Sequence, residues 1–153
     1  MLKRFGSVGI GTVLENIIVP LSVGCILYVV TRPDSYISRI ASEILNIRIG
    51  NGLLAPTNVP IWTKVIRNHA ADFLWAYAFA FAIMLVGRKT GINEPKLIIL
   101  CCIVSVLIEI SQVFSPFFTF DFVDILVEVI GIIVGWFVYR WHNHIKEKRE
   151  ISS

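Results

Sequence analysis

Cysteine and histidine, on which many metal and catalytic centres depend, are scarce in this chain, with three of each among 153 residues. Cys25, Cys101 and Cys102 all fall in apolar runs, their number is odd, and none has a ligand-like spacing to a histidine. We therefore expect buried thiols. The chain also lacks a Ser-His-Asp or Cys-His pattern and any nucleic-acid-binding motif. We predict no cofactor, no metal ligand and no nucleic-acid partner.

Charged residues are scarce as well, at 16%, whereas hydrophobic residues reach 56%. Soluble domains are typically about 45–50% apolar, so the composition predicts an integral membrane protein. Four apolar runs approach the length of about 20 residues that a membrane-crossing helix needs. They are Ile10–Val30, Ala70–Val86, Leu97–Phe114 and Phe122–Tyr139. We predict an all-α polytopic protein, a four-transmembrane-helix bundle that forms a single membrane domain over residues 1–153.

The basic residues predict the orientation, because Lys and Arg near the ends of spans stay on the cytoplasmic side. Lys3–Arg4, the loop Arg88–Lys96 and the basic tail 140–153 carry them densely, and Ser115–Phe120 carries none. We therefore expect both termini to be cytoplasmic, with Thr31–His69 and Ser115–Phe120 outside. No cleavage pattern follows the first run, so it is read as retained. The tail either contacts anionic inner-leaflet lipid or is simply solvated.

The first external loop predicts helices of its own. Asp34 or Ser35 can cap a short helix through Leu45, which we place along the outer interface. Pro60 can open a further helix that carries Trp62 toward the second run. This loop is read either as a lid over the outer mouth or as a tether between two spans.

Two residues of the first run predict local features. Pro20 predicts a kink. Asn16 predicts a polar contact between helices.

The fourth run has the clearest periodicity, because its polar and small residues recur every three or four positions and so share one helical face. They are Asp121, Asp124, Glu128, Gly131 and Gly135. The Gly-x-x-x-Gly spacing allows another helix to approach closely, as small residues do in membrane proteins. We predict that this partner is the second run, through Ala76 and Ala80.

Matching polar residues lie on two other runs. Ser105, Glu109 and Gln112 form a stripe on the third, and Asp72 lies near the outer end of the second. The third and fourth runs are joined by a short turn, so their polar faces can meet in an outward-facing acidic cleft. Alternatively, Asp72 and Asp121 are only N-terminal acids that favour the helix dipole. Glu109 lies within its run and has no such explanation.

These residues resemble the signature of a known family. Glu109-x-x-Gln112, Phe120-Asp121-x-x-Asp124 and Gly131-x-x-x-Gly135 together resemble the VanZ-like family of small bacterial membrane proteins, whose association is with resistance to the lipoglycopeptide teicoplanin. Asp72-x-x-Trp75 is also similar to the family pattern, and the resemblance covers about residues 68–139. It implies a multi-pass protein of the bacterial cell membrane. The implied ligand-binding residues are Asp72, Trp75, Glu109, Gln112, Asp121, Asp124 and Glu128.

Two positions depart from the family pattern. Glu128 stands where many members have Asn, and Phe118 stands where an Arg often precedes the Thr-Phe-Asp stretch. An added acid and a missing base are expected to make this site more negative than is usual in the family.

The leading functional hypothesis is a cell-envelope binding protein that influences glycopeptide and lipoglycopeptide sensitivity. Its expected partners are membrane lipids, a lipid-linked cell-wall precursor or lipoglycopeptide, and further copies of the chain. One alternative is a metal-dependent membrane enzyme, in which the carboxylates hold Mg²⁺ or Mn²⁺ and act on a lipid phosphate. The other is a small cation- or proton-coupled transporter, which short spans without an inverted repeat disfavour.

Overall fold

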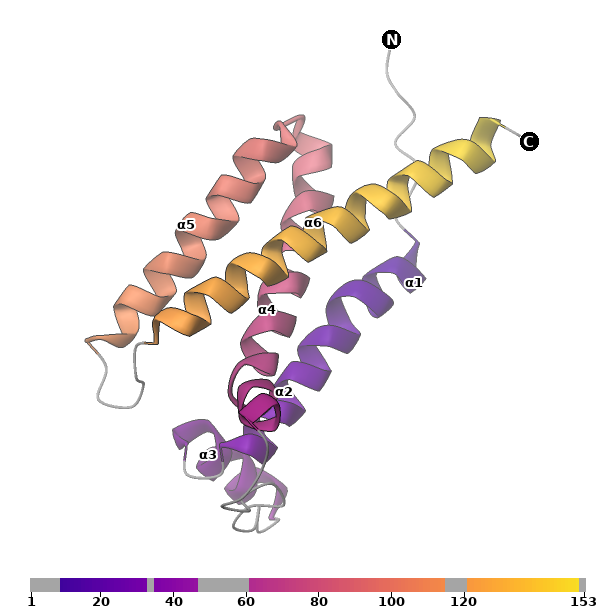
Figure 1. Cartoon of the computed structure of the whole chain (residues 1–153). Helices are drawn as coiled ribbons and strands as arrows, with labels where there is room; N and C mark the ends of the chain where they lie inside the picture. The colour runs from indigo at the N-terminus through magenta and orange to yellow at the C-terminus, as the bar shows by residue number, and fades with distance from the viewer. Residues whose placement is uncertain (1–8, 33–34, 47–60, 115–120, 152–153) are drawn as a thin grey trace.

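The computed structural model describes residues 9–32, 35–46, 61–114 and 121–151. Within these ranges the chain is helical and contains no strand, which confirms the all-α fold (Figure 1). The elements are α1 (Ile10–Val13), the π-helix η1 (Leu14–Ile18), α2 (Val19–Thr31), α3 (Tyr36–Leu45), α4 (Ile61–Thr90), α5 (Glu94–Gln112) and α6 (Phe122–Ile151).

Among the described residues, three helical stretches are long and apolar enough to cross a membrane, namely Ile10–Thr31, Asn68–Thr90 and Phe122–Ile145. They correspond to the first, second and fourth predicted spans, so the chain is a membrane protein. The third predicted span forms α5, which has 19 residues but is not among the three. A helix of that length rises roughly 28 Å, close to the ~30 Å of the hydrocarbon core. Its membrane crossing stays a prediction.

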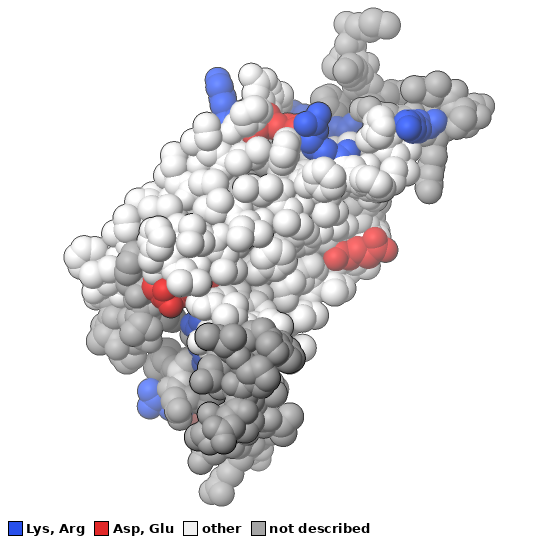
Figure 2. Space-filling model, viewed as in Figure 1, with Lys and Arg blue, Asp and Glu red and all other residues white. Residues whose placement is uncertain are grey.

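Helix α4 lies at the centre of the arrangement and packs against α2, α5 and α6. The start of α1, the turn between α4 and α5 and the end of α6 lie at one end of the molecule, and α3 and the start of α6 lie toward the other (Figure 1). Charged side chains gather toward these two ends, with a broad uncharged surface between them that one acidic patch interrupts at its right-hand edge (Figure 2). This distribution suits a helix bundle surrounded by lipid.

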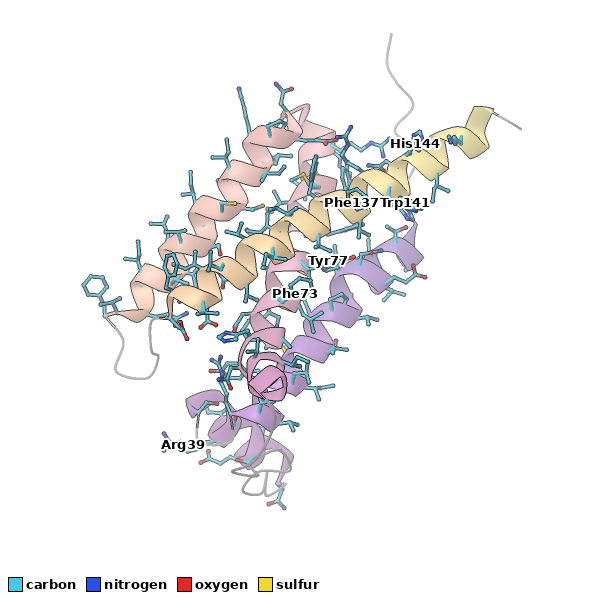
Figure 3. All side chains as sticks on the ribbon, in the orientation of Figure 1. Arg39, Phe73, Tyr77, Phe137, Trp141 and His144 are labelled. Atoms are coloured by element: carbon cyan, nitrogen blue, oxygen red, sulfur yellow. The ribbon has the colours of Figure 1, made fainter. Side chains whose placement is uncertain are left out.

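Gly131 and Gly135 pack against α4, as predicted. A Cβ atom at Gly131 would lie 2.7 Å from the carbonyl oxygen of Phe73 and 3.1 Å from the Cβ of Ala76. One at Gly135 would lie 2.6 Å from the carbonyl oxygen of Tyr77. Figure 3 labels Phe73 and Tyr77 where α4 crosses α6. The two glycines therefore let the backbones approach to a distance that no side chain would allow.

The first membrane helix contains a π-helical turn just before Pro20, the residue at which a kink was predicted. Proline has no N–H and its ring collides with the carbonyl group four residues earlier, which here belongs to Asn16. The wider turn of η1, Leu14–Ile18, accommodates this position. The predicted interhelical role of Asn16 is confirmed, because the Tyr77 hydroxyl group donates a hydrogen bond of 2.7 Å to its Oδ1.

Helix α3 begins where the sequence predicted. Its N-cap is Ser35, whose side chain accepts a hydrogen bond from the backbone N–H of Ser38. Ser38 is itself buried and donates to the carbonyl oxygen of Arg32 at 2.7 Å, which fixes α3 to the end of α2. Asp34 and Pro60 lie outside the described residues, and α4 begins at Ile61. That α3 lies along the membrane interface stays a prediction.

Helix α6 continues well beyond the predicted end at Tyr139 and includes most of the basic tail. The continuation is attached to its neighbours by polar contacts. Arg88 donates a hydrogen bond to Asn143 at 2.8 Å, and Trp136 donates to Glu94 at 2.9 Å. Arg140 pairs with the same Glu94 carboxylate at 3.6 Å. These contacts join α4, α5 and α6 at the end of the molecule opposite the acids discussed next.

Candidate acidic site

A histidine and an aspartate join α4 to α6 in the centre of the candidate site. His69 Nδ1 lies 2.5 Å from Asp124 Oδ1, and both side chains are almost buried, with exposed fractions of 12% and 10%. His69 lies at the start of the apolar part of α4, and Asp124 lies in the first turn of α6. The two helices begin their spans side by side, which brings together residues 55 positions apart in the sequence.

Helix α5 contributes Glu109, which is only 3% exposed. Its Oε1 accepts a hydrogen bond of 2.9 Å from Gln112, one turn later on the same helix. Its Oε2 is buried and has no hydrogen-bond partner among the described residues. The carboxylates of Asp72, Asp121 and Asp124 are close enough to interact with it electrostatically. The predicted stripe on the third run thus faces the acids of the second and fourth.

Glu128 lies one turn after Asp124 on α6 and belongs to the same group of acids. Its carboxylate accepts a hydrogen bond from the buried hydroxyl group of Ser105 on α5. It also interacts electrostatically with Glu109, Asp72 and Asp124. Ser105 was predicted as part of the polar stripe on the third run. It is the hydrogen-bond donor to Glu128, the acid that stands at the position where many VanZ-like proteins were said to have Asn.

Asp72 is paired with a basic residue from the start of the predicted external loop Thr31–His69. Arg32, the residue after α2, lies 3.5 Å from the Asp72 carboxylate and also donates a hydrogen bond to the carbonyl oxygen of Asn68. Its guanidinium group lies over the ring of Tyr28, 5.1 Å from the centroid. Because α4 begins at Ile61, about three turns before Asp72, the helix-dipole explanation does not apply to this acid.

Asp121 caps the start of α6, which agrees with the alternative explanation of this residue as an N-terminal acid. It immediately precedes α6, and its Oδ1 accepts a hydrogen bond of 2.9 Å from the backbone N–H of Val123. Its side chain is nevertheless part of the group, because ligand atoms of His69, Asp121 and Asp124 all lie within 4.8 Å of one another. Asp121 is exposed, whereas Asp124 is buried.

Trp75 is the predicted site residue that contacts a different surface. Its ring stacks on Tyr28, with centroids 5.5 Å apart, and it fills the space above Gly24, where an added Cβ would lie 2.6 Å from its Nε1. Trp75 therefore packs α4 against α2. It is linked to the acids through Tyr28, over which Arg32 lies, and a direct role in ligand binding stays a prediction.

The result is a group of carboxylates from three helices that we call the acidic site. Its acids are Asp72, Glu109, Asp121, Asp124 and Glu128. Its basic members among the described residues are Arg32 and His69. Arg32, which directly follows the first membrane helix, is thus a base of this site that lies far from the turn where Phe118 stands in the sequence. Acids still outnumber bases.

A comparison with protein-family models identifies the family of this chain. The model described as VanZ/LLP1 matches residues 7–143, so it includes the first membrane helix as well as the region that carries the acidic site. No curated protein and no solved structure matches the chain. The matched region covers most of the sequence and bears out the resemblance seen in the spaced acids and glycines. The chain belongs to the VanZ/LLP1 family.

Proposed function

We propose that this protein acts in the bacterial cell envelope, where its acidic site binds the polar headgroup of a lipid-linked ligand and thereby changes sensitivity to teicoplanin and related antibiotics. The observation that carries the proposal is the convergence of carboxylates from α4, α5 and α6 on one place. Family membership supports the link to lipoglycopeptides.

The chemistry of the acidic site favours binding over a purely structural role. Buried carboxylates in a membrane protein are costly, about 2.5–3.5 kcal/mol each for Asp at the centre of a span, and usually mark a functional site. A scaffold would need each acid to be paired. Here Arg32 lies 3.5 Å from Asp72 and His69 contacts Asp124, whereas Glu109 retains a buried oxygen without a partner among the described residues. Positive charge brought by the ligand, or by an ion bound together with it, would balance this excess.

The orientation that we propose puts the acidic site at the outer face. Arg88, Lys89, Lys96 and Arg140 lie at the opposite end of the bundle, and basic residues near span ends remain cytoplasmic. The site then lies near the outer headgroup region, within reach of lipid-linked envelope precursors. In this arrangement α5 crosses the membrane and both termini are cytoplasmic.

Antibiotic susceptibility tests the proposal directly. The gene would be deleted and then restored on a plasmid, and minimal inhibitory concentrations measured for teicoplanin, for vancomycin and for a ribosome-targeting drug as the control. We expect a several-fold change with teicoplanin that the plasmid reverses, and no change with the control drug. An unchanged value for every envelope-active compound would reject the proposed function.

A further inference from the structure

One part of the acidic site has the composition of a metal centre. His69 on α4 and Asp121 and Asp124 at the start of α6 place ligand atoms within 4.8 Å of one another. The leading sequence-based prediction had no metal ligand, and only the alternative of a metal-dependent enzyme placed Mg²⁺ or Mn²⁺ on the carboxylates. The fold brings an imidazole nitrogen and carboxylate oxygens to one place, and these are the groups that divalent metals coordinate.

A second observation is independent of this cluster and points to a missing positive charge. Glu109 is 3% exposed, and its Oε2 has no hydrogen-bond partner among the described residues. It interacts electrostatically with Asp124, Asp72 and Asp121, all of the same charge. A buried carboxylate oxygen without a partner is unfavourable, because it has lost its solvation and gained no hydrogen bond in exchange. A cation between Glu109 and the other acids would remove that cost.

We propose that His69, Asp121 and Asp124 bind a divalent transition metal ion such as Mn²⁺ or Zn²⁺, with Glu109 as a third carboxylate facing its charge. This deepens the proposed function and rests on it in one respect, because the metal would be the positive charge through which the site meets a phosphate-bearing headgroup. Binding of the metal itself does not depend on the identity of that ligand.

The choice of metal follows from the donor atoms. Mg²⁺ and Ca²⁺ are bound by oxygen ligands, whereas imidazole favours later divalent metals. Zn–N and Zn–O bonds are about 2.0–2.2 Å long, so the donor atoms of a tetrahedral site lie roughly 3.3–3.6 Å apart. Side-chain rotations would have to close the present spread of 4.8 Å to this distance. The hydrogen bond between His69 and Asp124 breaks when the metal coordinates the imidazole nitrogen.

The test uses the full chain, purified in detergent without a histidine tag and freed of metal by a chelator. Mn²⁺, Zn²⁺, Mg²⁺ and Ca²⁺ are titrated separately, with bound metal measured by mass spectrometry after desalting and affinity by calorimetry. We expect one-to-one binding of Mn²⁺ or Zn²⁺ at least about tenfold tighter than that of Mg²⁺ or Ca²⁺. Equal affinity for all four ions, or no stoichiometric binding, overturns the assignment.

Matched variants locate the ion. Asp121→Asn removes one ligand charge but keeps a good N-cap for α6, so it is expected to fold and to bind at least about tenfold more weakly. His69→Gln removes the nitrogen ligand, and loss of the nitrogen coupling in the Mn²⁺ electron spin resonance signal would identify it. His144→Gln is the control, because His144 is exposed near the opposite end of α6 (Figure 3). Equal weakening by the control overturns the assignment.

The outcomes separate the metal site from the proposed function. Stoichiometric metal binding together with unchanged antibiotic susceptibility would retain the metal site and reject the proposed function. A clear susceptibility effect in a protein that binds no metal would do the opposite.

Discussion

Ser105 on α5 donates a hydrogen bond to Glu128 on α6, and this contact joins the two helices midway along their shared surface. Ser105 is buried and Glu128 is half-buried, so water cannot easily replace the hydroxyl group if it is removed. The contact is specific to a chain that has Glu at position 128.

Ser105→Ala should lower the stability of the protein in detergent. The alanine would leave the Glu128 oxygen without its donor, and an unsatisfied buried polar group costs about 1–3 kcal/mol. The free energy of unfolding is expected to fall by an amount in this range, measured as a lower Tm. Ser111→Ala is the control, because Ser111 is exposed and bonds only within α5. Equal Tm values for the two variants would show that the Ser105 contact contributes nothing.

Substitution of the packing glycines should destabilise the bundle. In Gly131→Ala and Gly135→Ala the new Cβ meets the α4 backbone at 2.7 Å and 2.6 Å, so the helices must move apart. We expect a loss of about 1–3 kcal/mol for each, as for other overpacked positions. The measurement is thermal unfolding in detergent.

Gly11→Ala is the matched control for these variants. Gly11 is also helical but has nothing within 4 Å of an added Cβ. Because Ala is favoured over Gly in helices by about 1 kcal/mol, this variant is expected to be neutral or slightly more stable. The same sign of change in all three variants would contradict the close packing of α4 on α6.

The predicted topology is testable by cysteine labelling in a chain whose three native cysteines are replaced. Glu43→Cys on α3 and Phe114→Cys after α5 are suitable outer positions, because both side chains are exposed. Ser38 on α3 is unsuitable, because it is buried. Both should react with an impermeant thiol reagent added to intact cells. Thr90→Cys and His144→Cys should react only after the membrane is opened. Protection of Phe114→Cys together with Thr90→Cys would show that α5 does not cross.

Features encoded by local periodicity were predictable from the sequence. The shared face of Asp124, Gly131 and Gly135 follows from helical spacing, and the structure confirms its packing on Ala76 and Ala80. Ser35 was predicted as a possible cap from its residue type and position, and it caps α3. In each case the information lies within a few residues of the chain.

The pairing of charges was not predictable in the same way. Arg32 and Asp72 lie 40 residues apart, and His69 and Asp124 lie 55 apart. Their contacts depend on how α2, α4 and α6 pack, which no local pattern reports. The signal in the sequence that points to Arg32 is its position directly after the first apolar run, while Asp72 lies near the start of the second. The orientation of Trp75 toward Tyr28 depends on the same packing.

The last prediction separates a working acidic site from a scaffold. Glu109→Gln and Asp124→Asn keep the size of each side chain and most of its hydrogen-bonding capacity, but each removes one of several like charges. Both variants should fold at least as stably as the parent, because repulsion and the burial of charge are reduced. Both should also lose the effect on teicoplanin susceptibility, as expected for functional residues that are retained at some cost in stability.

Glu15→Gln is the control for these two variants, since Glu15 is an exposed acid on η1 and is not part of the acidic site. It should leave both Tm and susceptibility unchanged. Expression, Tm and minimal inhibitory concentration are measured together for all three variants. If the acids only form hydrogen bonds between helices, the same substitutions should alter Tm only slightly and leave susceptibility normal, because the amides keep the shape and most of the hydrogen-bonding capacity of the acids. Normal susceptibility at normal expression in Glu109→Gln and Asp124→Asn therefore rejects the acidic site as the active feature.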